Sequence, residues 1–151
     1  MLHRYEIFSA AVASMYHAIQ RIERVEMAKY GLKGPHAQCL LAMSHHRDGI
    51  TASRLCAICD KDKAAISRTV AELEREGLVE RCLKGSNRYR ALLKLTTLGE
   101  SAASHVEERV KLAVEKAGEG MSEQQRVAFY AVLELIAGRL QTICAEGLEN
   151  V

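Results

Sequence analysis

The residues best suited to specific chemistry lie between positions 61 and 69. They are small, basic or hydrogen-bonding side chains, namely Lys61, Lys63, Ala64, Ala65, Ser67, Arg68 and Thr69. If Ile66 and Val70 face a core, a helix would expose Ser67 and Arg68 near its N-terminal end. The Arg68 fork matches the O6 and N7 acceptors of guanine, the Ser67 hydroxyl can bond a base or a phosphate, and the alanines permit close approach. This chemistry suits the edge of a DNA duplex.

A second basic group follows in residues 78–95, where two short apolar runs flank turn residues at 84–87. This pattern predicts a β-hairpin with a basic tip. The basic side chains of interest are Arg81, Lys84, Arg88 and Arg90. The last three would reach the DNA backbone or a narrow minor groove, which attracts arginine. Arg81 and Lys61 are secondary candidates for phosphate contacts.

Charge is unevenly distributed, although the 151 residues carry a formal net charge of only +2. Residues 1–60 hold seven Lys and Arg against five Asp and Glu, residues 61–94 hold nine against five, and residues 95–151 hold five against nine. The basic excess therefore coincides with the two groups described above, and it favours a polyanionic partner there.

The remaining sequence predicts a helical scaffold for these side chains, because apolar positions recur at spacings of three and four. Helices are expected at 5–30, 35–46, 52–58, 63–76, 97–116 and 123–143, with caps at Thr51, Asp62, Thr96 or Thr97, and Ser122. Two short helices followed by a basic hairpin are typical of a winged helix-turn-helix, which places its second helix in the major groove. We expect a mostly α fold with a small β-hairpin wing, and a DNA-binding module at 34–97.

The two ends of the chain carry apolar stripes that this module cannot cover by itself. Phe8 and Val12 begin one stripe, and Leu133 belongs to another in the last helix. We expect residues 1–33 and 98–151 to form dimerisation helices against a second copy. Two recognition helices would then stand about one helical turn of DNA apart, roughly 34 Å, as a palindrome requires.

Other chemistries have weaker support. Cys56 and Cys59 form a Cys-x-x-Cys pair, but no second pair completes a zinc site, so we interpret both as small apolar residues. The six histidines form no HxxxH or HxxH pair, and we interpret them as surface residues without a metal or other cofactor. Phosphate loops, a nucleophile elbow and paired catalytic carboxylates are all lacking, which argues against an enzyme.

Cysteine usage and hydropathy indicate the compartment. Five scattered cysteines, an odd number, favour reduced and mostly buried thiols in a cytosol. No uninterrupted apolar run approaches the roughly 18 to 20 residues that cross a bilayer, and the N-terminus lacks a signal-peptide pattern. We therefore expect a cytoplasmic protein without a membrane partner.

The order of these features resembles the MarR family of bacterial regulators. The resemblance is carried by residues 62–70, by 77–81, by Leu95-Thr96 with Gly99, and by the glycine-to-proline segment 31–35. It implies a homodimer, a pseudo-palindromic operator on double-stranded DNA, and a small-molecule or redox signal that releases DNA, most often from a repressor. It also implies an effector pocket between the DNA-binding lobe and the dimer helices, for which Met15, His17 and Met43 are candidate lining residues.

The wing departs from the family pattern. Family members commonly carry Asp-x-Arg where this sequence has Asn87, Arg88 and Tyr89. Arg88 or Arg90 would then replace the usual arginine. Two alternatives stay open, namely a winged helix that binds a protein partner without DNA affinity, and a redox- or metal-responsive regulator of the same fold.

Overall fold

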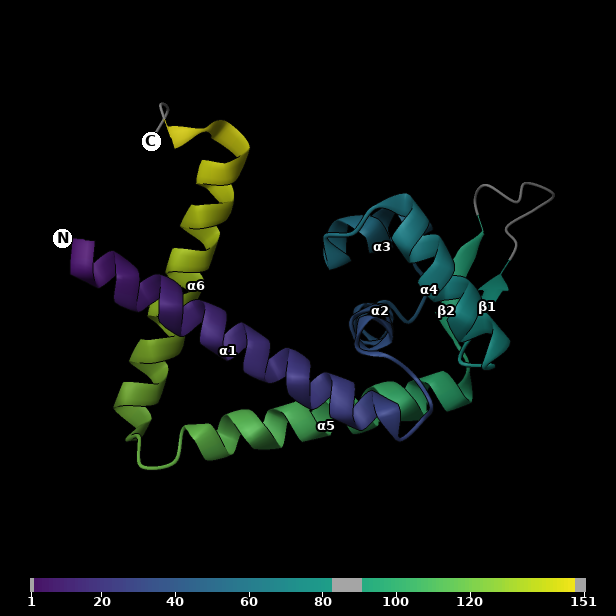
Figure 1. The fold of residues 1–151 in the computed structure, drawn as a ribbon, viewed down its shortest axis with the longest axis horizontal. Helices are drawn as coiled ribbons and strands as arrows, with labels where there is room; N and C mark the ends of the chain where they lie inside the picture. Colours follow the sequence, from purple (N-terminus) through teal and green to yellow (C-terminus); the bar gives the residue numbers. More distant parts are fainter. Residues whose placement is uncertain (1, 83–90, 149–151) are drawn as a thin grey trace. The chain divides into compact units, whose positions relative to one another are not determined.

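The computed structural model describes residues 2–82 and 91–148. The elements are α1 (Leu2–Ala28), α2 (Gly34–Ser44), α3 (Ala52–Cys59), α4 (Lys63–Arg75), β1 (Val79–Cys82), β2 (Leu92–Leu95), α5 (Thr97–Ala117) and α6 (Glu123–Glu146), as labelled in Figure 1. This order confirms the predicted mostly helical fold with one hairpin. The chain divides into two compact units, Met1–Leu112 and Ala113–Val151.

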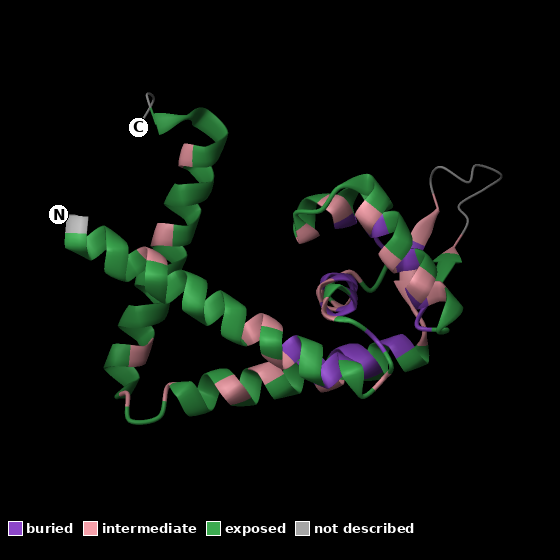
Figure 2. Ribbon diagram, in the orientation of Figure 1, coloured by how far each residue is buried: buried purple, intermediate pink, exposed green. Residues whose placement is uncertain are grey.

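Helix α2 lies at the centre of the first unit, where it packs against α1, α3, α4 and β2. Six of its eleven residues are buried. Figure 2 shows that burial is concentrated in α2, in one face of α4 and in the first half of α5. The helices that present functional side chains are therefore held by a common central element.

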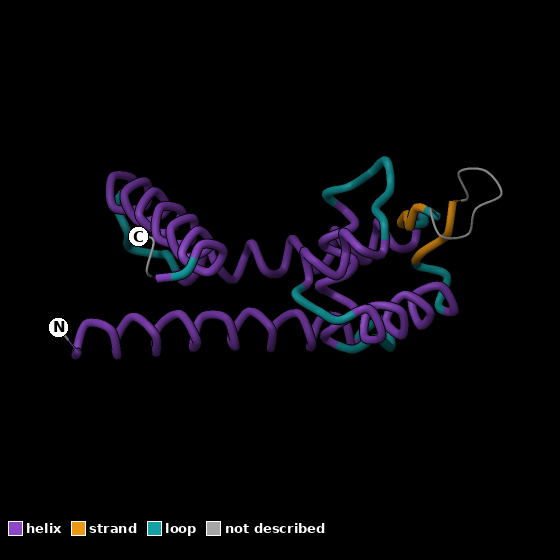
Figure 3. Tube along the Cα trace, turned by 90° about the horizontal axis from the view of Figure 1, so that it is seen from above, coloured by secondary structure: helices purple, strands orange, loops and turns teal. Residues whose placement is uncertain are grey.

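The hairpin is joined to this core through a third segment of chain. Strands β1 and β2 pair antiparallel, with Val79 opposite Leu95 and Cys82 opposite Leu92. Ile50 adds a bridge, because its N–H donates to the Leu93 carbonyl at 3.0 Å and its carbonyl accepts the Leu93 N–H at 2.8 Å. Figure 3 shows the strands at one edge of the helical unit. The predicted hairpin is confirmed in its paired part.

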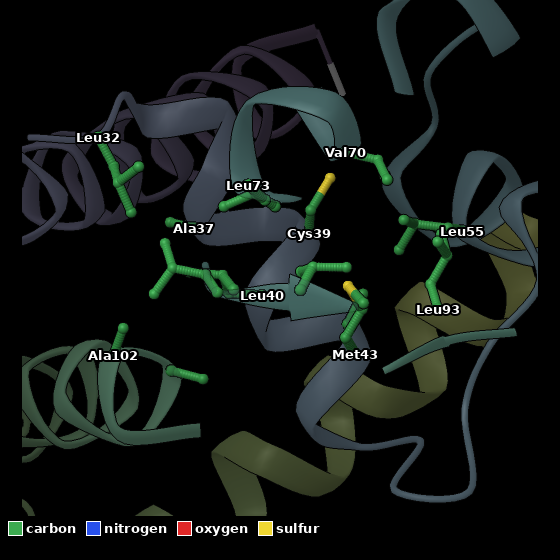
Figure 4. Close-up of a cluster of buried hydrophobic side chains, with 14 of the residues drawn as sticks. Leu32, Ala37, Cys39, Leu40, Met43, Leu55, Val70, Leu73, Leu93 and Ala102 are labelled. Carbon is green, nitrogen blue, oxygen red and sulfur yellow. The ribbon is translucent and has the colours of Figure 1, made fainter. Parts of the chain in front are cut away.

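The core closes around Leu40, which is 0% exposed. The same buried cluster includes Leu73, Leu93 and Ala102, contributed by α4, β2 and α5 (Figure 4). Each fully buried leucine contributes about 1.5–3 kcal/mol by removing apolar surface from water. One cluster therefore holds α4, the hairpin and α5 together.

A side-chain hydrogen bond links α4 to α2. His36 is 4% exposed; its Nδ1 accepts the Lys33 backbone N–H at 2.8 Å, which leaves Nε2 to donate to Glu72 Oε2 at 2.7 Å. This bond and the nearby Lys33 ammonium lower the pKa of the Glu72 carboxyl. The expectation of a surface histidine was wrong here, because both ring nitrogens find partners inside the fold.

A second histidine bonds a buried carboxylate between α1 and α5. His105 Nε2 lies 2.7 Å from Glu26 Oε2, and the rings of His105 and Tyr30 pack edge to face. The hydrogen bond from Lys29, then that from His105, lowers the pKa of Glu26. His105 is only partly exposed, so the surface interpretation was also too simple at this position.

The start of α5 is fixed by close packing on the turn between α4 and β1. Thr96 Oγ1 donates to the Gly77 carbonyl at 2.7 Å and accepts the Gly99 N–H at 3.1 Å, which selects Thr96 over Thr97 as the cap. A Cβ at Gly99 would lie 2.0 Å from the Leu78 carbonyl oxygen. That oxygen accepts the Thr96 N–H, so the backbone cannot move away without losing a hydrogen bond.

Apolar side chains of α1 remain uncovered in the first unit. Phe8, Val12 and Met15 are exposed along the N-terminal half of the helix, together with Tyr5 and Ile7. Exposed apolar residues that are contiguous on one helix mark an interaction surface more often than scattered ones do. This half of α1 therefore presents a face without a partner among the described residues.

The second unit consists mainly of α6, which begins at the predicted capping box. Ser122 Oγ accepts the Gln125 N–H, and Gln125 Oε1 accepts the Ser122 N–H. No residue of Glu123–Glu146 is buried, and the apolar side chains spaced three positions apart at Val127, Tyr130 and Leu133 are all exposed. The predicted stripe therefore exists and lacks a cover within the described chain.

By length and composition alone, α6 is also the one helix of the described residues that could cross a membrane. An 18-residue window in it reaches a mean hydropathy of 1.4. Glu134 and Arg139 interrupt the apolar run. A charged residue at the bilayer centre costs about 2.5–3.5 kcal/mol, which favours a protein partner over lipid as the cover for this helix.

We predict that Gly99→Ala lowers the free energy of unfolding by about 1–3 kcal/mol or more, since the added methyl meets backbone that cannot yield. Urea unfolding followed by circular dichroism measures the change. Ser101→Ala, at an exposed position of the same helix, should stay within about 0.5 kcal/mol of the parent chain. Equal stability of the two variants would contradict the packing described for Gly99.

We predict that Glu72→Gln lowers the free energy of unfolding at neutral pH, because the lowered pKa of Glu72 stabilises the folded state with the carboxylate ionised. This contribution is fully present above the ordinary carboxyl pKa of 4.5 and is lost as the pH falls through the lower folded value. Urea unfolding at several pH values should show the free energies of unfolding of the parent chain and of Glu72→Gln converging below pH 4.5. Glu76→Gln, an exposed control at the end of the same helix, should show no such convergence.

Candidate nucleic-acid interface

The turn between α3 and α4 sets the direction of the candidate recognition helix. Asp60 adopts a left-handed conformation with φ 49° and ψ 51°, which reverses the chain after Cys59. The Lys61 N–H then bonds the Cys56 carbonyl at 3.1 Å. Asp62 caps α4, with its Oδ1 accepting the Ala65 N–H at 2.8 Å. Aspartate tolerates the left-handed region through local hydrogen bonding, and the sequence alone gave no indication of this geometry at Asp60.

One face of α4 enters the core and the opposite face is open. Ile66, Val70 and Leu73 are buried, as their spacing predicts. The exposed side chains in the first two turns are Lys63, Ala64, Ser67 and Arg68, with Ala65 and Thr69 partly exposed beside them and Lys61 exposed in the turn. The structure therefore brings all seven predicted residues of this segment together at the N-terminal end of α4, six on the helix and Lys61 in the turn before it.

This end of the helix has the properties of a base-reading surface. Two alanines leave space for close approach, while Ser67 and Arg68 add donors that reach further out. The N-terminal end of a helix also carries a partial positive charge, which favours a phosphate nearby. Arg68 forms no ion pair with any described residue, so its guanidinium is available to an external acceptor.

Arg81 has a different environment from Arg68. Its Nε and Nη2 donate to the two carboxylate oxygens of Glu74, at 2.7 and 3.0 Å. This bidentate hydrogen bond raises the pKa of Arg81 and holds the side chain against α4. As a phosphate contact, Arg81 would have to share its donors with Glu74. The remaining wing candidates, Lys84, Arg88 and Arg90, lie outside the described residues.

The three candidate effector residues occupy different surroundings. Met15 is exposed on α1, as is His17 two residues later, whereas Met43 is buried in the core beside Leu40. Met43 also borders a cavity of about 680 Å³ lined mainly by polar residues of the 43–48 segment and α5. Among the main cavities of the described chain, none is lined by all three of these side chains. An effector pocket built from them stays a prediction.

The cysteines are less buried than expected. Cys39 is buried, Cys56, Cys59 and Cys82 are partly exposed, and Cys144 is exposed. Cys56 and Cys59 do pack against the core, as their interpretation as small apolar residues predicts. The sequence did not reveal that Cys59 and Cys39 line one cavity, because the two belong to different helices. Within residues 2–82 and 91–148, no group of three or more His, Cys, Asp or Glu side chains is placed to hold a metal ion.

Comparison with known proteins adds to this geometry. Residues 30–88 match the sequence pattern of the MarR family. No curated protein matches the chain. Among solved structures, a MarR family transcription regulator is similar with a TM-score of 0.78 and 21% identity, over 97% of this chain and 99% of its own.

Two further similar structures were solved with a bound molecule, one with DNA and one with a small ligand. A MarR family transcriptional regulator from Listeria monocytogenes, complexed with a 26mer DNA, has a TM-score of 0.77 and 18% identity, over 91% of this chain and 93% of its own. CouR from Rhodococcus jostii RHA1, bound to p-coumaroyl-CoA, has a TM-score of 0.70 and 22% identity, over 90% of each chain. The resemblance seen in the sequence is therefore confirmed: residues 30–88 match the MarR family, and the chain has the winged-helix fold of MarR-family transcription regulators.

Proposed function

We propose that this protein is a sequence-specific DNA-binding transcription regulator, without enzymatic activity, that acts in the cytoplasm. Residues 34–97 form its DNA-binding module, and α4 enters the major groove. Ser67 and Arg68 read base edges, Ala64 and Ala65 allow close approach, and Lys61, Lys63 and Thr69 contact the neighbouring backbone. The wing, with Lys84, Arg88 and Arg90, holds the adjacent phosphates or minor groove.

The observation that carries this proposal is the open N-terminal face of α4. A face that served solubility alone would favour Glu and Lys, whereas this one combines two alanines, a hydroxyl and an arginine that forms no ion pair with a described residue. The opposite face is buried, so the helix is held rigidly while the exposed face stays available. The DNA complex of the regulator from Listeria monocytogenes, which shares this fold, supports the same use here.

We further propose that the functional form is a homodimer on a pseudo-palindromic operator. Residues 1–33 and 98–151 would supply the dimerisation helices. The uncovered apolar side chains of α1 and of α6 support this, since each helix presents a face that the described part of its own unit leaves open. A two-fold dimer buries the same surface on both copies and repeats the reading helix once per half-site.

Repression relieved by a small-molecule effector is the mode of regulation that we propose. CouR, which shares this fold, is bound to p-coumaroyl-CoA. An effector releases DNA only to the extent that it prefers the form of the dimer that does not fit the operator. Met15, His17 and Met43 remain candidates for contact with it in the dimer.

We predict that Arg68→Ala weakens binding to the preferred duplex by about 1–3 kcal/mol and relaxes base preference at one position of each half-site. Fluorescence anisotropy across a salt series measures the affinity, and substituted duplexes measure the preference. Binding through phosphates should also fall steeply with salt in the parent chain.

Arg75→Ala is the matched control, because Arg75 is an exposed arginine at the opposite end of α4, paired with Glu76. It should leave base preference unchanged. An Arg68→Ala protein with the same base preference as the parent would contradict the assigned role. Salt-insensitive or undetectable DNA binding by the parent chain would instead favour a winged helix that binds a protein partner.

A further inference from the structure

A buried carboxylate on α1 has no partner in the described chain. Glu23 is 8% exposed, and it forms no hydrogen bond or ion pair with a described residue. Glu26, the other buried carboxylate of the described chain, differs in this respect, because it is bound by Lys29, His105 and Arg109. A buried charge without a partner is unfavourable. Glu23 therefore offers an unused acceptor for a cationic group.

Glu23 lines a cavity whose wall is mainly polar. The cavity has a volume of about 310 Å³, near the lower end of the range of about 300–1,000 Å³ that is usual for small-molecule sites. Its lining residues are Gln20, Glu23 and Arg24 of α1, Lys33, Gly34, Pro35 and Gln38 at the start of α2, and Lys61 before α4. Met15, His17 and Met43 are not among them. The size and polarity suit a small charged metabolite.

The charges of this cavity are separated by depth. Its buried or half-buried polar side chains are those of Glu23, Gln20 and Gln38, and its exposed cations are Arg24, Lys33 and Lys61. Burial raises the pKa of the Glu23 carboxyl, and no cation opposes this shift, so the exposed cations do not compensate the carboxylate. The cavity therefore has an acidic inner wall and a basic rim.

Neutral groups beside the charges complete the site. The Gln20 amide nitrogen donates to the Tyr16 hydroxyl at 2.8 Å, which leaves the carbonyl oxygen of Gln20 to accept from an ammonium group. At the rim, the Gly34 N–H stands at the first position of α2, where a helix leaves its N–H groups without an internal partner. Such an N–H suits an anionic oxygen.

We propose that this cavity binds a small zwitterion of the amino-acid class, with its ammonium group on Glu23 and its carboxylate on the basic rim. The ammonium would neutralise the buried charge and donate to the Gln20 carbonyl. The carboxylate would pair with Lys33 and Lys61, the two ammonium groups of the rim. Both ends of the ligand would then meet groups of opposite charge.

Other classes of ligand satisfy only one end of this site. A simple anion such as inorganic phosphate would find the rim but would be repelled by the Glu23 carboxylate. A metal ion would find a single carboxylate among three cations, and the described residues include no group of three or more side chains placed to hold a metal. An uncharged aromatic molecule would leave Glu23 without a partner.

Lys61 would connect this site to DNA binding. Under the proposed function its ammonium group contacts the DNA backbone, and the same side chain lines the cavity. A ligand carboxylate on Lys61 would therefore compete with a phosphate of the DNA. This consequence rests on the proposed function, whereas binding of the zwitterion does not.

Thermal unfolding of the full chain with each of the common L-amino acids at millimolar concentration tests the site, followed by calorimetric titration. At least one amino acid should raise the Tm, because a ligand that binds only the folded state stabilises it. Its N-acetyl derivative, which lacks the ammonium, and its amide, which lacks the carboxylate, should each bind at least about tenfold more weakly. Binding of no amino acid, or equal binding of the N-acetyl derivative, would overturn the proposal.

Glu23→Gln should weaken binding of that amino acid by about 10- to 150-fold, the loss expected for one hydrogen bond between charged groups, and should remove the preference over the N-acetyl derivative. Glu6→Gln, at an exposed position of the same helix, should bind as the parent does. Without ligand at neutral pH, Glu23→Gln should have a higher Tm than the parent, because an uncompensated buried charge is lost. A retained preference in Glu23→Gln would overturn the role of Glu23, and the derivatives decide the site on the parent chain even if this variant does not fold.

Fluorescence anisotropy on the preferred duplex measures the connection to DNA. A saturating concentration of the amino acid should weaken DNA binding by about 5- to 150-fold, the usual range of coupling between sites, and should have little effect on Glu23→Gln. Unchanged DNA affinity of the saturated parent would overturn the competition at Lys61. If the parent chain bound no DNA, the proposed function would fail, and the calorimetric titration would still decide the site.

Discussion

The packing of α2 into the centre of the first unit is the interaction on which the rest of that unit depends. Leu40 is enclosed by side chains from α4, β2 and α5, and His36 binds α4 from the same helix. The bridge between Ile50 and Leu93 fixes the hairpin to the segment that follows α2. The exposed face of α4 is therefore presented by a rigid support, which base readout requires.

Apolar side chains of α1 and α6 lie outside this core and remain exposed. The exposed stripe of α1 and the uncovered length of α6 contain the kind of side chains that stabilise obligate interfaces. Under the proposed function, folding of the first unit and assembly with a second copy would draw on different residues of one chain. A signal acting on the dimerisation helices would then change DNA binding without disturbing the central cluster.

The sequence predicted those features that are determined locally. Helix positions, the caps at Thr51, Asp62 and Ser122, and the buried face of α4 depend on residues within a few positions of one another. For the same reason the residues of the open face of α4 could be named in advance. The bond between His36 and Glu72, 36 positions apart, could not be found this way.

The cavity that Cys39 and Cys59 both line could not be predicted for a related reason. It depends on how α2 packs on α3, whereas the sequence shows only the spacing of Cys59 from Cys56. Likewise, the bidentate bond between Arg81 and Glu74 depends on the approach of β1 to α4. Polar pairs across elements follow from tertiary packing, which periodicity does not describe.

Selection of bound sequences from a random pool of DNA duplexes tests the central claim most directly. The account predicts enrichment of a palindrome whose half-sites are centred about 10 base pairs apart, as expected for two recognition helices in a symmetric dimer. Failure to enrich any sequence, or enrichment of a single half-site without symmetry, would contradict a dimeric reader of DNA.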